Sequence, residues 1–480
     1  MGLNNVTVEG YDYATPVEDA QIGQIIDLDL GEIPTAKTLI GGQFYQDLVD
    51  NRVQIVERMN SGNPRYLCAE CLTPVYLVST PDKRFFFRHR SEEDDSCSAK
   101  TRPPLTAEEI TARKYHGLRE SQPHKHIKSL IERSLAADAD FSDIAVERNW
   151  KGADSRRYRR PDVQAGHLQG KIAFEVQLST TFLSVVAGRR AFYRREGGLL
   201  VWVFGSFDAG YRRLTTDDLL YSNNSNIFIV DDETTELSER TGIFHLRCHY
   251  RMPVRDDAKI TDAWAEKVVP FADLTQDRDG QRLFLFDFHA ADAALRAAIQ
   301  QEADDAKAMA IRIDQADLYE FWLEHGRSFR HTPENRASWR QLRDRYERRG
   351  LELPEFPDSH EATRVMLSAL YSARDGKPMG YKFSKLVQVA HQVAEACPSL
   401  FIAFYSAVDA YGHNDLLNSQ DGSGKWRQRL KGADGIFSRI KRDDPVFQPE
   451  GSVLPLIYFL FPEISDRVAA AVDRYRDSLF

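Results

Sequence analysis

The sequence predicts a mixed α/β protein, of α/β or α+β type, that ends in an all-α region. The first observation is an element order of helix, strand, strand, strand, helix and strand within residues 101–210, which follows from the changing period of the apolar residues. The second is a mostly helical pattern from Ala290 to the end of the sequence. With 480 residues, 42% of them hydrophobic and 28% charged, the chain can form roughly two to four globular domains.

Changes of pattern along the chain divide it into five segments. We find no internal repeat and no glycine-rich loop that would cradle the phosphates of ATP. The segments are an N-terminal segment (1–64) with a predicted helix at 44–59, a cysteine-containing segment (65–100), the α/β core (101–210), a mixed β extension (211–300) with strand candidates at 227–230, 243–250 and 282–286, and a helical domain (301–480).

Three of the five cysteines lie within residues 65–100, and their spacing predicts a metal site. Cys68 and Cys71 are separated by two residues, so a tight turn can present both thiolates to one ion. His89 and Cys97 are candidates for the third and fourth ligands of a closed, structural Zn²⁺ site of zinc-knuckle type. The alternative is that His89 is an ordinary strand residue and that the cysteines are reduced and carry no metal.

Two helices are predicted at the start of the α/β core, at 106–119 and from Ser121 to about Leu135. Ser121 can cap the second helix, which has a proline in its first turn. Its apolar residues recur with helical spacing, while His124 and Lys128 lie four residues apart on a neighbouring face. Taken alone, that pair is typical of a solvated helix face.

Three strands follow, and the second and third bring two acidic residues together. After a short strand at 142–148, a hairpin is predicted with arms at 161–163 and 171–178 and a turn at 164–170. Asp162 and Glu175 then project from paired strands, an arrangement that can hold a divalent cation. Because residues alternate along a strand, Glu175 and Gln177 share one face. The alternative is a half-buried antiparallel strand whose polar residues face water.

A helix at 180–196 and a continuously apolar, buried strand at 199–204 complete the core. Farther along, His245, Cys248 and His249 lie on a strand candidate. Strand alternation places the two histidines on one face and the cysteine on the other. We therefore interpret these three residues as structural.

The charge distribution indicates where a partner that carries phosphates would bind. The chain has a formal charge of −9, but residues 100–200 contain 19 Lys and Arg against 12 Asp and Glu. A basic segment on an acidic chain is typical of nucleic-acid-binding proteins. Its densest part is the loop at 151–160, where Arg156, Arg157, Arg159 and Arg160 surround Tyr158.

The composition also gives an expected location. No apolar run approaches the ~20 residues of a membrane span, and the first residues lack the pattern of a signal peptide. Five cysteines are too few for a disulfide framework in a chain of this length. We therefore expect a cytoplasmic protein without membrane contacts.

Several motifs together resemble the CoiA-like competence nuclease family, within the PD-(D/E)XK nuclease superfamily. The resemblance covers about residues 65–205 and implies a sequence-tolerant deoxyribonuclease of the kind found in competence, recombination and antiphage defence proteins. The helical domain matches no family that we recognise. The motifs are the zinc-knuckle start, E-x3-H-x3-K (Glu120, His124, Lys128), R-P-D-V (160–163), F-E-V-Q-L-S (174–179), R-x2-F-Y and L-V-W-V-F.

The resemblance implies a site for Mg²⁺ or Mn²⁺ formed by Asp162, Glu175 and the main-chain carbonyl of Val176, with Glu147 or Glu120 completing the acidic set. Where the wider superfamily has a lysine, this chain has Gln177, which carries no charge. We expect Lys128 to supply the missing charge near the phosphate.

We expect the four arginines of the 151–160 loop to bind the DNA backbone and Tyr158 to stack on a base. The alternative, which Gln177 keeps open, is a catalytically weak nuclease fold that acts as a DNA-binding or scaffold subunit of a larger complex. A protein partner could bind through the helical domain. The oligomeric state stays open, with a homodimer as one option.

Overall fold

The computed structural model describes residues 12–80, 82–90, 97, 122–154, 156–178, 183–210, 212–257 and 259–477. The predicted helix at 106–119 and Glu120 lie outside these residues. The chain forms two compact units that divide between residues 301 and 302, within helix α8 (Phe288–His325). The fold is mixed α/β with a central mixed sheet and C-terminal helices, which confirms the predicted class at this level.

The first unit begins with a small α/β region. Two antiparallel strand pairs, β1 (Ile25–Asp27) with β2 (Tyr66–Cys68) and β3 (Val75–Ser79) with β4 (Phe85–His89), accompany helices α1 (Ala36–Gly41) and α2 (Tyr45–Asn60). The predicted helix at 44–59 is thus confirmed as α2. Its apolar face shares one core with α5 (Leu183–Arg195) and α6 (Leu214–Ser222), so this region packs directly on the central sheet's helices.

The central sheet has seven strands in the order β13-β12-β11-β10-β9-β8-β5. Strands β9, β10 and β11 run parallel to one another, and the other neighbours are antiparallel. The strands are β5 (Phe141–Val146), β8 (Val163–His167), β9 (Ile172–Gln177), β10 (Leu199–Phe204), β11 (Asn226–Ile229), β12 (His245–Asp256) and β13 (Lys259–Pro270).

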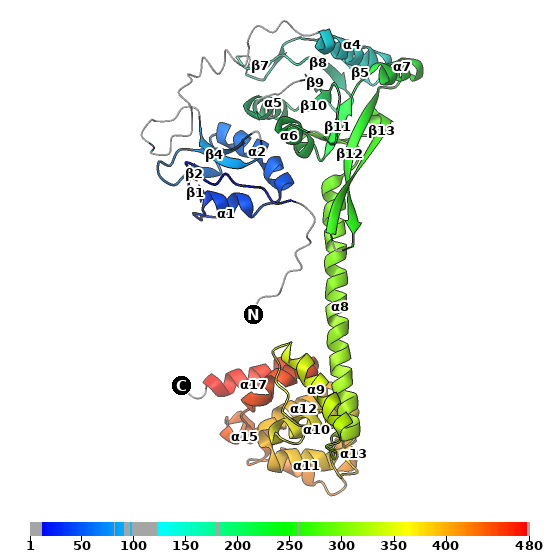
Figure 1. Ribbon diagram of the computed structural model, residues 1–480. Helices are drawn as coiled ribbons and strands as arrows, with labels where there is room; N and C mark the ends of the chain where they lie inside the picture. Colours follow the sequence, from blue (N-terminus) through cyan, green and yellow to red (C-terminus); the bar gives the residue numbers. More distant parts are fainter. Residues whose placement is uncertain are drawn as a thin grey trace. The chain divides into compact units, whose positions relative to one another are not determined.

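Helices cover both faces of the centre of this sheet (Figure 1). On one face, α4 (Gln122–Ala137) packs its predicted apolar stripe, including Ile127 and Ile131, against Phe174 of β9. On the other face, Phe192 and Tyr193 of α5 cover the central strands. Helix α7 (Asp232–Thr241) packs beside α4. Strand β9 is therefore buried on both sides, and the alternative that its polar face meets water is wrong.

The predicted turn at 164–170 is too long. Strand β8 continues to His167, with Val163 opposite Phe174 and Ala165 opposite Ile172. Residues 164–167 have little strand propensity, but β8 lies between β5 and β9, and pairing on both edges holds it extended. At Gly166 a Cβ atom would lie 2.7 Å from Ser142 Oγ on β5, so glycine permits this close approach.

The strand candidates at 199–204, 227–230, 243–250 and 282–286 are confirmed as β10, β11, β12 and β15 (Arg282–Phe284), although β12 extends to Asp256. Strand β13 was not predicted, because β12 and β13 form a long ribbon in which Pro253 and several charged residues obscure the alternation. The basic 151–160 loop also contains two short paired strands, β6 (Trp150–Lys151) and β7 (Tyr158–Arg159). Strand β14 (Thr275–Asp277) pairs with β15.

The second unit is all-α within the described residues, as the pattern from Ala290 predicts. A single large core joins its helices, with α10 and α12 packed against each other. Its helices after α8 are α9 (Pro333–Glu347), α10 (Glu361–Asp375), α11 (Leu386–Ala396), α12 (Phe401–Ala410), α13 (Asn414–Gln420), α14 (Lys425–Leu430), α15 (Ile436–Lys441), α16 (Leu454–Leu460) and α17 (Ser465–Asp477). Short 3-10 helices lie at Phe271–Asp273 in the first unit and at Pro398–Leu400, Pro445–Phe447, Gly451–Val453 and Pro462–Ile464 in the second.

In the described part of the chain, no single helix has both the length and the apolar composition to cross a membrane. One sharply bent pair, Leu386–Ala396 with Pro398–Ala410, reaches that composition, and many of its apolar residues lie in the core of the second unit.

Candidate functional site

The cysteine-containing segment begins with a tight turn that presents two thiols. Cys68 is the last residue of β2, and the Leu72 N–H donates a hydrogen bond to its carbonyl oxygen at 2.9 Å. Leu72 has a φ of 59°, which closes the turn, and the Cys68 N–H donates to Thr73 O at 2.9 Å. The two-residue spacing of Cys68 and Cys71 thus produces the knuckle that it predicts.

The other two predicted ligands complete a cluster. His89 ends β4, and its Nε2 lies 3.3 Å from Cys71 Sγ. The four ligand atoms of Cys68, Cys71, His89 and Cys97 all lie within 4.8 Å of one another, close to the sulfur–sulfur separation of about 3.8 Å expected around a tetrahedral zinc ion. Cys68, His89 and Cys97 are buried. This Cys3His cluster could hold a metal ion such as zinc, and four protein ligands would leave no open position for catalysis.

Asp162 lies immediately before β8 and is held by two hydrogen bonds. Its Oδ2 accepts from the Val176 N–H at 2.8 Å and lies 3.2 Å from His124 Nε2. Burial alone raises the pKa of the Asp162 carboxyl, but the hydrogen bonds from His124 and Val176 outweigh it and lower the pKa below its usual range. The same contact with Asp162 raises the pKa of His124. Asp162 is therefore a carboxylate with a fixed orientation at neutral pH.

Glu175 lies one strand farther on and is almost completely buried, with 2% of its surface exposed. Its Oε2 forms an ion pair with the guanidinium of Arg189, and its Oε1 accepts a hydrogen bond from Tyr193 OH at 3.3 Å. Both partners come from α5. The Arg189 guanidinium also lies over the ring of Trp202, which is opposite Glu175 on β10. A buried carboxylate requires such a cation, because an unpaired charge is costly in the interior.

Glu147 follows β5 and brings a third carboxylate to the same end of these strands. Its N–H donates to Asp162 O at 3.0 Å, which fixes the two residues side by side. Its carboxylate forms ion pairs with Lys128 of α4 and with Arg160. The contact with Lys128 lowers the pKa of Glu147. Glu147, Asp162 and Glu175, which we call the acidic cluster, thus lie at or next to the same end of three neighbouring strands, β5, β8 and β9.

The structure therefore brings most of the predicted catalytic residues together. His124 and Lys128 both face the acidic cluster, so the solvated-face interpretation of this pair is wrong. Lys128 is 4% exposed and contacts Glu147, which places its charge at the Glu147 side of the cluster. Gln177 is buried on the same strand as Glu175.

The basic loop forms a small hairpin around β6 and β7, which we call the basic hairpin (residues 150–160). The Arg156 side chain is 89% exposed, and Arg157 and Tyr158 are also exposed. The other two arginines have partners in the fold. The Arg159 guanidinium lies 5.5 Å from the centre of the Phe192 ring, and Arg160 forms an ion pair with Glu147. The hairpin thus runs from the acidic cluster into solvent.

Two residues of this site were not assigned a role from the sequence, namely Arg189 and Tyr193. They are four residues apart on α5 and so share the face that turns toward β9. The R-x2-F-Y motif contains both, and its helical spacing is the signal that could have identified them.

Two protein-family models match the chain, each over a different part of the first unit. A model described as a domain of unknown function (DUF6035) matches residues 108–289, which include the acidic cluster and the basic hairpin. Another domain of unknown function (DUF7830) matches residues 31–103, which include the Cys3His cluster. No curated protein and no solved structure matches the chain.

Proposed function

We propose that this protein is a metal-dependent deoxyribonuclease that hydrolyses phosphodiester bonds. The observation that carries the proposal is the acidic cluster, in which Glu147, Asp162 and Glu175 lie at the same end of three neighbouring strands. The order α4, β5, β8, β9, α5, β10 supports the resemblance to the PD-(D/E)XK nucleases. A role in antiphage defence or in DNA processing and recombination follows from that resemblance.

Asp162, Glu175 and the main-chain carbonyl of Val176 are the groups that would hold Mg²⁺ or Mn²⁺, since hard cations prefer oxygen ligands. Such an ion supplies a nucleophilic water and stabilises the charge that develops on the phosphate. Within the chain, His124 and the Val176 N–H orient Asp162, while Lys128 and Arg160 hold Glu147. These contacts fix the carboxylates before any substrate arrives.

Arg189 is the best candidate to replace the lysine that Gln177 lacks. Its guanidinium already lies against Glu175, whereas the ammonium of Lys128 lies against Glu147. A guanidinium can form two parallel hydrogen bonds to a phosphate, so Arg189 can bind the scissile group once Glu175 has another cation as partner. Lys128 then acts through Glu147 as a positioning residue.

The basic hairpin is the proposed DNA contact. Its exposed arginines can neutralise backbone phosphates next to the acidic cluster, and the exposed ring of Tyr158 can stack on a base. We also propose that a protein partner binds the helical unit. Formation of a homodimer is a further proposal.

One observation favours a second candidate, a catalytically weak nuclease fold that binds DNA as a scaffold subunit. Each carboxylate of the acidic cluster already has a cationic side chain or histidine as its partner, and Gln177 adds no charge. A cluster that the protein neutralises by itself has less need of a metal ion.

The deciding experiment is to incubate the purified chain with linear, circular and single-stranded DNA in Mg²⁺, Mn²⁺ or EDTA. The nuclease proposal expects cleavage with a divalent cation and none in EDTA, and the Asp162→Asn variant serves as control. DNA binding without cleavage under every condition would favour the scaffold proposal. Equal cleavage by Asp162→Asn would assign the activity to a contaminant.

A further inference from the structure

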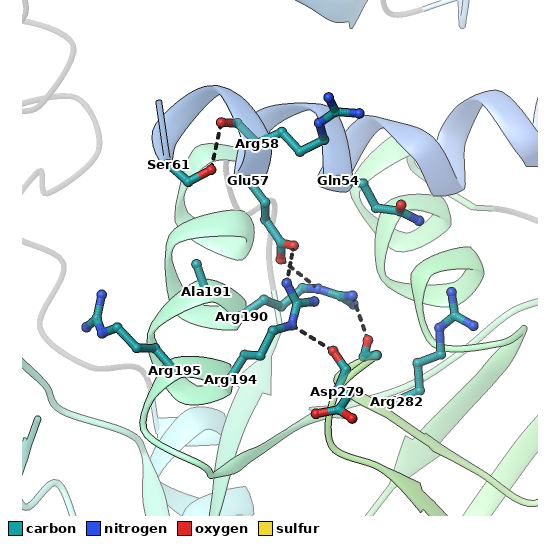
Figure 2. Close-up of a pocket in the computed structure, with 11 residues that line it drawn as sticks. Gln54, Glu57, Arg58, Ser61, Arg190, Ala191, Arg194, Arg195, Asp279 and Arg282 are labelled. Carbon is teal, nitrogen blue, oxygen red and sulfur yellow. Dashed lines mark hydrogen bonds and ion pairs between the residues drawn. The ribbon is translucent and has the colours of Figure 1, made fainter. Parts of the chain in front are cut away.

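A second, chemically different site lies on another side of α5. It is a pocket of about 480 Å³ within the first unit, between α2, α5 and the turn that joins β14 to β15 (Figure 2). Charged side chains dominate its wall, with five arginines against two acidic residues. The lining residues are Gln54, Glu57, Arg58, Ser61, Arg190, Ala191, Arg194, Arg195, Asp279, Gly280 and Arg282.

Helix α5 separates this pocket from the acidic cluster. Successive residues of a helix point about 100° apart, so Arg189 and Tyr193 share one face, while Arg190 and Arg194 share the next. The first pair contacts Glu175, and the second pair lines the pocket. The two sites therefore use different groups of the same helix.

Arg190 forms the fixed wall of the pocket. It is 5% exposed, and its Nε donates to Glu57 Oε1 at 3.1 Å. Its terminal nitrogens donate to Ser222 O at 3.2 Å and Gly280 O at 2.9 Å. This network ties α5 to α2 and to the β14–β15 turn, as Figure 2 shows for Glu57 and its two arginines. The wall is therefore preformed.

Arg194 and Arg282 retain unused hydrogen-bond donors. Arg194 donates through Nη1 to Glu57 Oε2 at 2.8 Å and through Nε to Asp279 O at 2.7 Å, which leaves Nη2 without a hydrogen bond in the described part of the chain. The Arg282 guanidinium makes no hydrogen bond to any described residue, although its Nε is buried. Its ion-pair partner is Asp50, at 3.9 Å. The Nε atoms of Arg88 and Arg278 share this feature, and Asp50 Oδ1 is a buried acceptor without a hydrogen bond to a described residue, so the Arg282 guanidinium keeps donors that a pocket ligand could use.

The other two arginines are already committed to acidic residues. Arg58 donates two hydrogen bonds to Asp29, at 2.6 and 2.8 Å, and Arg195 Nε lies 3.0 Å from Glu196 Oε1. The terminal nitrogens of Arg195 are also spare within the described residues, but its side chain points away from Arg194 and Arg282 (Figure 2), so those two arginines supply the spare donors that we consider. Burial raises the pKa of Asp50, and the charge of the Arg282 guanidinium opposes this rise.

We propose that this pocket binds a phosphate group. Guanidinium groups match the tetrahedral oxygens of phosphate and bind them with paired hydrogen bonds. Ala191 is the single apolar side chain among the lining residues, and none is aromatic, so guanidinium groups are the main groups that the pocket offers to a ligand. The phosphate can belong to a nucleic-acid strand or be a free ion. The proposal concerns binding and does not depend on cleavage at the acidic cluster.

The test measures binding to the full chain in EDTA, so that neither cleavage nor a divalent cation contributes. Titration calorimetry with inorganic phosphate and with pyrophosphate examines the free ions, and fluorescence anisotropy with a short single-stranded oligonucleotide examines the strand. We expect the Arg194→Gln, Arg282→Gln double variant to bind the recognised ligand at least tenfold more weakly. Arg133→Gln, which removes an exposed ion pair between Arg133 of α4 and Glu239 of α7, is the matched control and should bind normally.

A second variant covers the case in which the double variant does not fold. Gln54 is exposed at the pocket and forms no hydrogen bond or ion pair with the residues that the structure describes, so Gln54→Glu adds a negative charge without removing such a contact. It should also weaken phosphate binding at least tenfold.

The two ligands distinguish the sources of the phosphate. If the variants bind the oligonucleotide more weakly, and inorganic phosphate competes with the oligonucleotide for the wild-type chain, the pocket binds a nucleic-acid strand. If the variants bind only inorganic phosphate or pyrophosphate more weakly, the pocket binds free phosphate. Unchanged binding of both ligands in both variants, or no binding of either ligand by the wild-type chain, overturns the proposal.

Discussion

The buried carboxylate of Glu175, at the centre of the sheet, forms an ion pair with the partly exposed guanidinium of Arg189 on the helix that covers it. The strand brings a carboxylate into an interior where it cannot stay unpaired, and α5 supplies the compensating guanidinium. The pair therefore joins β9 to α5 and compensates the buried charge of Glu175. In the proposed function, a divalent cation bound to Glu175 would leave the Arg189 guanidinium able to contact a phosphate.

Removing the acidic ligands should abolish cleavage without abolishing DNA binding. Asp162→Asn and Glu175→Gln keep the shape of each side chain but remove the charge that would hold a divalent cation. We expect no detectable metal-dependent cleavage, and DNA affinity unchanged or slightly higher because repulsion of phosphate decreases. Asp143→Asn, an exposed residue of β5 with a positive φ that asparagine tolerates, is the control and should stay active. Full activity of Asp162→Asn would refute the nuclease proposal.

Arg189 and Lys128 can be ranked by matched substitutions to Met. Arg189→Met should reduce the cleavage rate by about 10² to 10³, the usual effect of losing one group that stabilises the transition state. Lys128→Met should have a smaller effect, because Arg160 still holds Glu147. Single-turnover rates at saturating DNA distinguish the two. A larger loss in Lys128→Met would mean that Lys128 compensates for Gln177.

The basic hairpin should dominate the salt dependence of DNA binding. Replacing Arg156, Arg157 and Arg159 by Ala should reduce the slope of log K against log salt by about 0.9 for each phosphate of duplex DNA that the variant no longer neutralises. Arg160 is left unchanged in this variant because it holds Glu147. Anisotropy titrations between low and moderate salt provide the measurement. An unchanged slope would place the DNA-binding surface on another part of the chain.

The Cys3His cluster should contain one zinc ion per chain and contribute directly to folding. Cys71→Ser should remove the zinc and lower the melting temperature and the yield of folded protein, because Cys71 joins the β2 turn to His89. Elemental analysis and thermal unfolding test this. Cys397→Ser, in the helical unit and outside the cluster, should keep both the zinc and the melting temperature. A wild-type chain purified without chelator and found free of zinc would contradict the prediction.

The buried pair of Arg52 on α2 and Asp218 on α6 should give the stability a specific pH dependence. The two groups are 2.7 Å apart, and burial raises the pKa of Asp218 to about 6, above its usual value of 3.8. A raised carboxyl pKa means that the folded state binds the proton more tightly, so this residue's contribution decreases as pH rises through that interval. The difference in free energy of unfolding between wild type and Asp218→Asn should decrease from about pH 4 to pH 6 and then level off. A difference that stays flat across this interval would contradict the assignment.

The sequence by itself determined most of the elements and one of the sites. The spacing of apolar residues along the sequence identified α2, α4, α5, β9, β10 and the helical second unit. Such spacing can be recognised locally, because each pattern depends on residues only a few positions apart. The spacing of Cys68 and Cys71 was sufficient for the knuckle, since a tight turn is a local structure. Pairing of Asp162 with the strand of Glu175 followed from hairpin connectivity. The length of β8 and the existence of β13 did not, because strand limits depend on partners elsewhere in the sheet.

Only the tertiary structure decided which charged groups meet. Helical spacing shows that Arg189 and Tyr193 share a face, but it does not show that this face covers Glu175. The sequence places Lys128 on a helix next to the predicted hairpin, but only the packing of α4 shows that Lys128 contacts Glu147. The pocket is the extreme case, because Glu57, Arg190 and Gly280 come from segments that are distant in the sequence. Contacts of this kind depend on how layers pack, and a local pattern carries no information about them.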